Sequence, residues 1–151
     1  MKKLLYILTA LLLMTGCGEK NHGPEKKEPT FEDKLCAEWH SEMLPMDNAD
    51  IYLQLNKDKT FELYQKIGEG RYRKYAGTYT LTDAILSGKY SDGAEWGSSY
   101  AVSFEGEVLL LTAQNGSAEV CKYEKKSLSQ SDKDNAAVVT KADDEQEPRF
   151  L

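Results

Sequence analysis

The chain has 151 residues, with 25 acidic and 19 basic side chains and a formal net charge of −6 at pH 7. This length fits one domain of ordinary size, and the acidic balance disfavours nucleic acids and anionic lipid surfaces as partners. Three cysteines and two widely spaced histidines, without a Cys-x-x-Cys pair, give no pattern typical of a metal site, and no cofactor motif is present.

The first 16 residues follow the order of a secretory signal peptide. Lys2 and Lys3 precede an apolar run at residues 4–14, and small residues then lead into Cys17. A helix that stays in a bilayer needs about 20 apolar residues, so this run is too short to remain as a transmembrane anchor. The segment ending Met-Thr-Gly-Cys resembles a bacterial lipoprotein signal with its lipobox, and the cysteine directly after Thr-Gly disfavours ordinary secretion.

This resemblance implies cleavage before Cys17, whose thiol would carry a diacylglycerol, with palmitate among the expected acyl chains. Each CH₂ buried in the bilayer contributes about 0.8 kcal/mol, so two or three chains anchor a protein stably. We therefore expect a lipid-anchored protein of the cell envelope, at the outer membrane, with periplasmic and surface display both open. The mature chain would have a net charge of −8, because the signal removes two lysines.

Residues 17–34 are predicted to be the lipidated cysteine and a flexible tether. The stretch 18–30 holds two prolines, two glycines and no large apolar side chain, so it cannot bury surface. Residues 31–35 are expected to form a turn of helix that leads into the domain.

Residues 35–127 alternate apolar and polar side chains between turn signals, which predicts short β-strands. Eight strands are predicted, at residues 37–43, 51–55, 61–66, 75–81, 84–90, 100–104, 108–112 and 118–125. Every link between them is short, so consecutive strands should be antiparallel neighbours.

Eight such strands are enough to close a small up-and-down barrel without exposed edges. The predicted fold class is therefore all-β, an eight-stranded antiparallel barrel, with a two-sheet sandwich as the alternative. A barrel of this size is just wide enough to be filled by side chains, so a large cavity is not implied.

Residues 128–151 are predicted to be a polar, largely disordered tail. The acidic run at 142–148 carries no apolar side chain beyond Ala142, while Phe150 and Leu151 are candidates for an anchor. Residues 136–139 suit either a short helix or a strand, and the sequence does not decide between them.

Several segments resemble the lipocalin-like domains of lipoproteins from Gram-negative gut bacteria. They are Leu-Cys-Ala-Glu-Trp at 35–39, where lipocalins carry Gly-x-Trp in the first strand, Tyr-Ala-Gly-Thr-Tyr at 75–79, the stretch 88–100, and Arg-Phe-Leu at 149–151. The resemblance implies that Trp39 plugs the closed end of the barrel, although alanine replaces the lipocalin glycine. It implies little about function, because fold alone does not give activity.

A second resemblance is to the membrane-bound lysozyme inhibitors, which are also small lipid-anchored β-barrels. Ser-Gly-Lys-Tyr at 87–90 resembles their loop, although the fuller Ser-Gly-Ser-Gly pattern is missing. The acidic net charge would suit a basic lysozyme.

Cys36 and Cys121 remain once Cys17 is lipidated. They fall on the first and last predicted strands, which are neighbours in a closed barrel, and an oxidising compartment favours a disulfide between them. Two buried free thiols are the alternative.

No catalytic residues are predicted. No sequence pattern gives His40 a nucleophile or carboxylate partner. Asp92 and Glu95 could in principle form an acid–base pair, but a solvated turn explains them more simply. We expect a protein without enzymatic activity.

The aromatic residues give the candidate binding site. Tyrosine and tryptophan suit the mouth of a ligand-binding barrel, although an ordinary core would also use them. The predicted cavity or rim residues are Tyr79, Trp96, Tyr100 and Phe104. Two functions follow as hypotheses: a lipocalin-like barrel that binds a small apolar ligand, or a module that interacts with a lysozyme or an envelope protein. A packed interior would argue against the first.

Overall fold

The structure, a computed structural model, describes residues 28–43, 48–139 and 149–151. The predicted signal peptide, Cys17 and most of the tether therefore lie outside the described residues, as does the acidic run at 142–148. The elements in chain order are α1 (Phe31–Leu35), β1 (Glu38–Met43), β2 (Ala49–Leu55), β3 (Thr60–Ile67), β4 (Arg73–Thr82), β5 (Ile85–Tyr90), β6 (Tyr100–Glu105), β7 (Val108–Ala113), β8 (Val120–Lys125), α2 (Gln130–Asn135) and β9 (Ala137–Val138).

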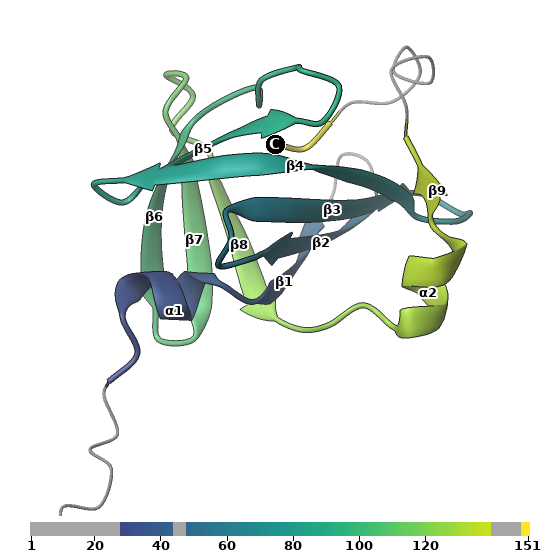
Figure 1. The fold of residues 1–151 in the computed structure, drawn as a ribbon, viewed down its shortest axis with the longest axis horizontal. Coiled ribbons are helices and arrows are strands. Elements are labelled where there is room, and N and C mark those ends of the chain that lie inside the picture. The colour runs from purple at the N-terminus through teal and green to yellow at the C-terminus, as the bar shows by residue number, and fades with distance from the viewer. Residues whose placement is uncertain (1–27, 44–47, 140–148) are drawn as a thin grey trace, which may run out of the picture.

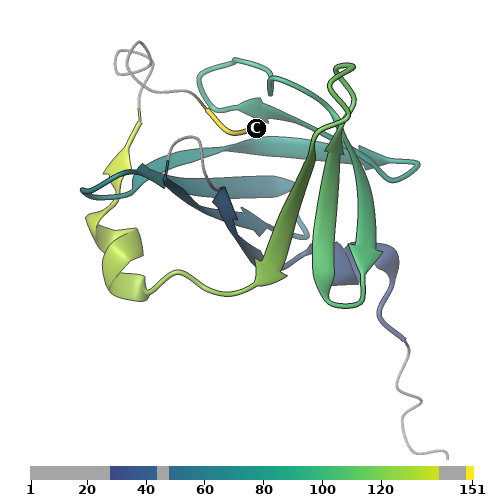
Figure 2. The same cartoon turned by 180° about the vertical axis from the view of Figure 1, so that it is seen from behind.

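Strands β1 to β8 form a closed antiparallel barrel (Figures 1 and 2). Each strand pairs with the next one in the chain, and β1 pairs with β8 at Trp39–Lys125 and His40–Glu124. All eight predicted strands are present, and the up-and-down barrel is confirmed. The closure excludes the alternative of two separate sheets.

Because consecutive strands alternate in direction, the barrel has two distinct ends. We call the end at α1 and at the β2–β3, β4–β5 and β6–β7 turns the closed end. We call the opposite end, formed by the β1–β2, β3–β4, β5–β6 and β7–β8 connections, the mouth. In Figure 1, α1 and the β6–β7 turn of the closed end lie below, the β4–β5 turn lies at the left, and the C-terminal end of the chain lies above β4.

The barrel interior is filled by side chains. Trp39, Leu53, Leu63, Leu109 and Leu111 are fully buried, and they alternate along their strands with more exposed residues, as the period of two requires. Phe61 and Tyr123, each 1% exposed, complete this packing. The apolar area that these residues remove from water is the main source of stability.

The turn between β4 and β5 is tight and strained. Thr82 pairs with Ile85, and the two residues between them, Asp83 and Ala84, have φ angles of 50° and 61°. Positive φ at both central residues is the geometry of a type I′ hairpin turn, in which Asn-Gly is preferred. A residue with a Cβ at the second position therefore carries backbone strain.

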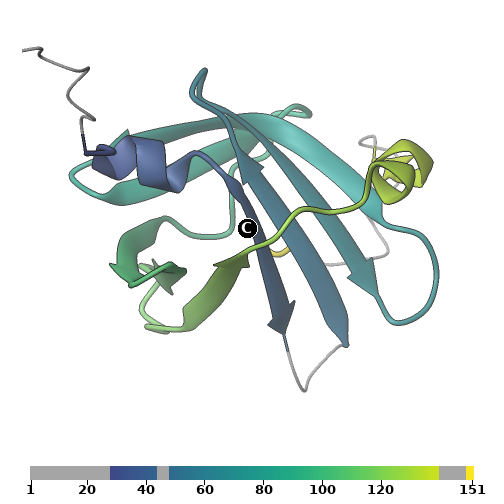
Figure 3. The same ribbon diagram turned by 90° about the horizontal axis from the view of Figure 1, so that it is seen from below.

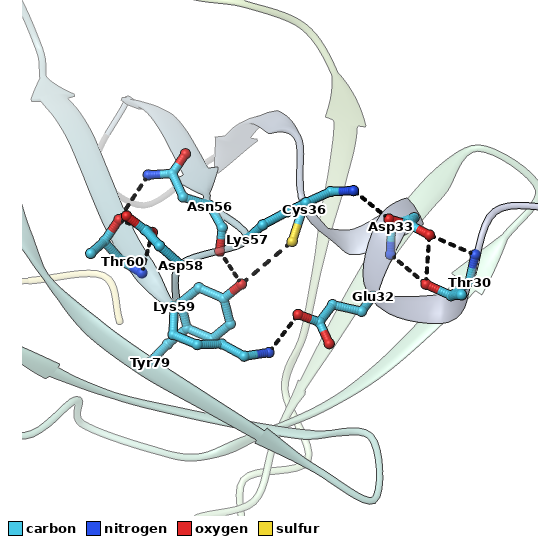
Figure 4. A network of polar contacts seen from close by, with 10 residues as sticks. All are labelled: Thr30, Glu32, Asp33, Cys36, Asn56, Lys57, Asp58, Lys59, Thr60 and Tyr79. Atoms are coloured by element: carbon cyan, nitrogen blue, oxygen red, sulfur yellow. Dashed lines mark hydrogen bonds and ion pairs between the residues drawn. The ribbon is translucent and has the colours of Figure 1, made fainter.

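The closed end is latched by α1. Thr30 caps this helix and forms a capping box with Asp33. Lys57 Nζ lies 2.6 Å from Asp33 Oδ1, and Lys59 Nζ lies 2.7 Å from Glu32 Oε1, so both lysines of the β2–β3 turn pair with the helix (Figure 4). These contacts hold α1 beneath the barrel.

The prediction of a disordered tail is wrong for residues 128–139. Leu128 is buried against the outward-facing tyrosines of β2 and β3, and Lys133 Nζ lies 2.9 Å from Glu38 Oε2. Helix α2 is capped by Ser129, and β9 then pairs in parallel with the start of β4. Figure 3 shows α2 on the outside of the barrel wall. The backbone N–H of Leu128 also donates to Glu38 Oε1 over 2.7 Å, so this segment is fixed by contacts with a residue about 90 positions earlier in the chain.

Candidate functional site

The mouth of the barrel is occupied by residues 149–151. Leu151 is 3% exposed and belongs to the main core cluster. The hydroxyl of Tyr90, on β5, donates to the Leu151 carbonyl oxygen over 3.0 Å. Burial raises the pKa of Tyr90 above its usual value, so this donor stays protonated across the physiological range.

Arg149 is held at the rim of the mouth by one acid and two aromatic rings. It pairs with Asp92 of the β5–β6 connection, and its guanidinium lies 4.4 Å from the centre of the Tyr90 ring and 5.5 Å from that of Tyr75. A cation over an aromatic face is favourable by about 0.5–2 kcal/mol. The predicted anchor at residues 150–151 is thus completed by Arg149, to which the sequence analysis gave no anchoring role.

Trp96 lies across the inside of the mouth. Its ring contacts Phe61 and Tyr100, with centroids 5.0 and 6.2 Å apart. It also covers Gly88, where an added Cβ would come within 2.2 Å of the indole. Glycine at this position is therefore required for the ring to approach β5.

The indole N–H of Trp96 is buried and has no hydrogen-bond partner among the described residues. A buried donor without a partner costs about 1–3 kcal/mol. Tyr100 beside it is 8% exposed, and burial raises its pKa to about 12, so it too presents a neutral hydroxyl at pH 7. The mouth therefore combines an aromatic wall with an N–H donor, that of Trp96, which has no acceptor among the described residues.

A pocket of about 370 Å³ lies at the same end of the barrel, and we call it the mouth pocket. It lies between the end of β3, the β3–β4 loop, the start of β4 and β9. Gln65 and Arg73 are register partners on β3 and β4, and Gln65, which is fully buried, donates to the hydroxyl of Tyr75 inside the barrel. Lys66, the next residue on β3, lies over the ring of Tyr72, which belongs to the separate outer cluster, so the pocket is lined from both faces of this strand.

The four predicted binding residues divide between the two ends. Trp96 and Tyr100 lie together at the mouth. Tyr79 lies at the closed end, where its hydroxyl donates to Asn56 O over 2.6 Å and lies 3.5 Å from Cys36 Sγ (Figure 4). Phe104 also lies at the closed end, 6.0 Å from Trp39 and 5.4 Å from Phe31 between ring centroids. The structure brings together two of the four.

Trp39 occupies the position that its predicted role as a plug requires. It is fully buried at the start of β1, and its indole N–H donates to Leu35 O, at the end of α1, over 2.9 Å. Lys125 of the neighbouring β8 lies 5.6 Å above its ring. The tryptophan thus ties α1, β1 and β8 together beneath the core.

The predicted disulfide is not formed, and both described cysteines are free thiols. Cys36 lies at the closed end, whereas Cys121, near the start of β8, lies close to the mouth. The first and last strands are neighbours, as predicted, but the register places the cysteines about a strand length apart, roughly 20 Å. A disulfide needs Cα atoms within about 7 Å.

His40 has a structural role on the outer wall of the barrel. Its Nε2 lies 2.7 Å from Asp50 Oδ1, and its ring packs at 4.5 Å on Tyr52, under the segment that carries α2. Tyr72 also donates to Asp50. These hydrogen bonds and the tyrosines beside them support residues 126–139 on the barrel wall. Asp92, the other candidate considered for catalysis, also has a structural role, because it pairs with Arg149.

Within residues 28–43, 48–139 and 149–151, no three His, Cys, Asp or Glu side chains gather as metal ligands. The same part of the chain contains no helix long and apolar enough to cross a bilayer. No protein-family model, no curated protein and no solved structure matches the chain. The mouth is the candidate site on its geometry, because it combines an aromatic wall and a buried N–H donor, with a pocket at the same end of the barrel.

Proposed function

We propose that the chain is a lipid-anchored, non-catalytic binding protein of the cell envelope that holds a small apolar ligand at the mouth of its barrel. The observation that carries this proposal is the environment of Leu151, an apolar side chain that is buried in the same core cluster as Trp96 and Tyr100 and whose carbonyl oxygen accepts a hydrogen bond from Tyr90. A ligand that replaced Leu151 would meet the same aromatic wall and could accept the hydrogen bond from Trp96 Nε1.

The ligand does not extend far below the mouth in this proposal. Trp39, Phe61 and Tyr123 fill the space beneath it, and no cavity is needed there. An apolar group the size of a leucine side chain, or a chain of a few methylenes, fits the space that Leu151 takes. Burying each methylene contributes about 0.8 kcal/mol, so four or five methylenes contribute about 3–4 kcal/mol and dissociation constants in the millimolar range are expected for such ligands.

The test is the binding of N-phenyl-1-naphthylamine, a neutral apolar probe that fluoresces when it leaves water. We expect saturable binding to the chain, tighter binding to Leu151→Ala, and weaker binding to Tyr100→Ala. Phe104→Ala is the matched control, because it removes a predicted binding aromatic at the closed end. Equal losses for Tyr100→Ala and Phe104→Ala, or no saturable binding, would overturn the proposal.

A protein-interaction module is the second candidate function. The filled interior favours it, and so do two exposed apolar side chains near the mouth, Val120 at 47% and Val138 at 69% exposed. In that case Val120→Ser would abolish capture of a lysozyme or of an envelope protein, while leaving probe binding unchanged.

The anchoring part of the proposal has its own test. Cells given labelled palmitate should transfer the label to the chain, and Cys17→Ala should remove both the label and the membrane association.

A further inference from the structure

The mouth contains a buried hydrogen-bond donor that the fold does not use. Trp96 is 6% exposed, and its indole Nε1–H has no acceptor among the described residues. The ring is held in place by Phe61 and Tyr100, whose centroids lie 5.0 and 6.2 Å away, and by its close approach to Gly88. An unsatisfied buried donor is costly, so a ligand that brings an acceptor to this N–H relieves that cost.

The hydroxyl of Tyr100 is a second donor beside the indole. Tyr100 is 8% exposed, and its hydroxyl forms no hydrogen bond with any residue that the structure describes. Burial, with smaller effects of Cys121 and Glu119, raises the pKa of Tyr100 to about 12, so the O–H keeps its proton at pH 7. The two neighbouring rings, those of Trp96 and Tyr100, therefore both carry uncharged donors.

A ligand that displaces Leu151 would also release a third donor. Tyr90 is 4% exposed, and its hydroxyl donates to Leu151 O over 3.0 Å. A pure hydrocarbon in the place of Leu151 would leave this hydroxyl without an acceptor, in addition to the donors of Trp96 and Tyr100. A carbonyl oxygen has two lone pairs and can accept two hydrogen bonds, so a carbonyl compound suits this surrounding better.

The charges around these donors favour a neutral acceptor over an anion. The negative charge of Glu119 adds to the larger effect of burial in raising the pKa of both Tyr100 and Cys121. Arg149, at the rim, is already paired with the carboxylate of Asp92. A ligand carboxylate would lose its hydration here and meet a like charge, whereas a neutral carbonyl group loses much less on burial.

We infer that the ligand of the mouth is a neutral apolar molecule with a carbonyl oxygen, such as a ketone or an ester, and that this oxygen accepts hydrogen bonds from Trp96 Nε1–H and the Tyr100 hydroxyl. The apolar part of the ligand takes the place of the Leu151 side chain in the core cluster. This inference rests on the proposed function and adds the chemical class of the ligand.

The test compares three probes that share the branched apolar group of leucine: isobutyl methyl ketone, isovalerate and isopentyl chloride. Isovalerate has the shape of the ketone but a negative charge, and the chloride is neutral but a poor hydrogen-bond acceptor. Each probe is titrated into the chain at pH 7 and followed by ¹H–¹⁵N NMR. We expect the ketone to bind about tenfold more tightly than the other two probes and to move the Trp96 indole proton downfield, as an accepted hydrogen bond does.

Two variants remove the donors one at a time. Tyr100→Phe deletes only the hydroxyl, and Trp96→Phe deletes the N–H but keeps an aromatic ring. Each should lower the preference for the ketone over isopentyl chloride about threefold or more. Tyr79→Phe is the matched control, because its hydroxyl donates to Asn56 O at the closed end, and it should keep the full preference. Thermal unfolding of each variant checks that the barrel is intact.

The two ideas fail in different ways. If isopentyl chloride binds as tightly as the ketone, if isovalerate binds more tightly, or if either Tyr100→Phe or Trp96→Phe keeps the full preference, the carbonyl site is wrong and the apolar site stands. If none of the three probes binds, the proposed function is wrong, and the inference falls with it.

Discussion

The two tryptophans of the chain mark the difference between the two ends of the barrel. At the closed end, the indole N–H of Trp39 donates to Leu35 O over 2.9 Å, and the neighbouring Tyr79 hydroxyl donates to Asn56 O. At the mouth, the indole N–H of Trp96 is equally buried but has no partner among the described residues. At the closed end the aromatic donors bind backbone carbonyls and so stabilise the fold, whereas the Trp96 donor at the mouth can bind another molecule.

The largest effect that this comparison predicts is a loss of stability when Trp39, at the closed end, is removed. Trp39→Ala should reduce the free energy of unfolding by about 3–5 kcal/mol, because it empties a fully buried site beneath the core. Urea denaturation measures this value. A loss below about 1 kcal/mol would mean that α1 and β8 close the barrel without the tryptophan.

A matched pair of substitutions isolates the hydrogen bond. Trp39→Phe and Trp96→Phe remove the same ring atoms, but only the first leaves a carbonyl, Leu35 O, without its donor. We expect Trp39→Phe to cost about 1–3 kcal/mol more than Trp96→Phe in urea denaturation. Equal costs would show that the two ends do not differ in this way.

A stabilising change should be available in the β4–β5 turn of the closed end. Ala84→Gly removes the strain of a Cβ at a φ of 61° and should raise stability by about 0.5–1 kcal/mol. Ala101→Gly, in the extended strand β6, should instead lower stability by a similar amount. The pair is compared by thermal unfolding, and a loss in both would contradict the positive φ at Ala84.

The smallest effect concerns pH and the latch of α1. The hydrogen bond from Lys57, with others from Thr30, lowers the pKa of Asp33 from 3.8 to about 2. The folded state therefore binds this proton less readily than the unfolded state, so the contribution is complete above about pH 4 and is lost as the pH falls towards 2.

Asp33→Asn should flatten the stability profile between pH 4 and pH 2, whereas Glu105→Gln, at an exposed position of β6, should leave it unchanged. Parallel profiles for the native chain and Asp33→Asn would show that the contacts of Asp33 with Lys57 and Thr30 do not stabilise the fold. The effect is modest because both partners are solvated.

Much of the fold could be predicted because the period of two shows which side chains face inward. The alternation of apolar and polar side chains located all eight strands. The short connections between them predicted the strand order and, with it, the closed barrel. Alternation does not show how far along the barrel a residue lies, so Phe104 and Tyr79 were placed with Trp96. Reading strand direction as well would have separated them, since β4 ends and β6 begins at opposite ends.

The other misses come from contacts that link distant parts of the chain. Residues 128–139 carry little apolar pattern, and their order depends on Leu128 and on the pairing of Lys133 with Glu38. The disulfide prediction failed because strand adjacency says nothing about register. Tyr75, Tyr90 and Arg149 were missed at the mouth because only the assembled barrel brings them together.

The most direct test of the account uses the two indole N–H groups, which give two separate signals in a ¹H–¹⁵N NMR spectrum. On titration with N-phenyl-1-naphthylamine, the signal of Trp96 should move and that of Trp39 should stay in place, since only the former lies at the mouth with an unused donor. Movement of Trp39 alone, or binding of the probe without any change at Trp96, would contradict the assignment of the mouth as the binding site.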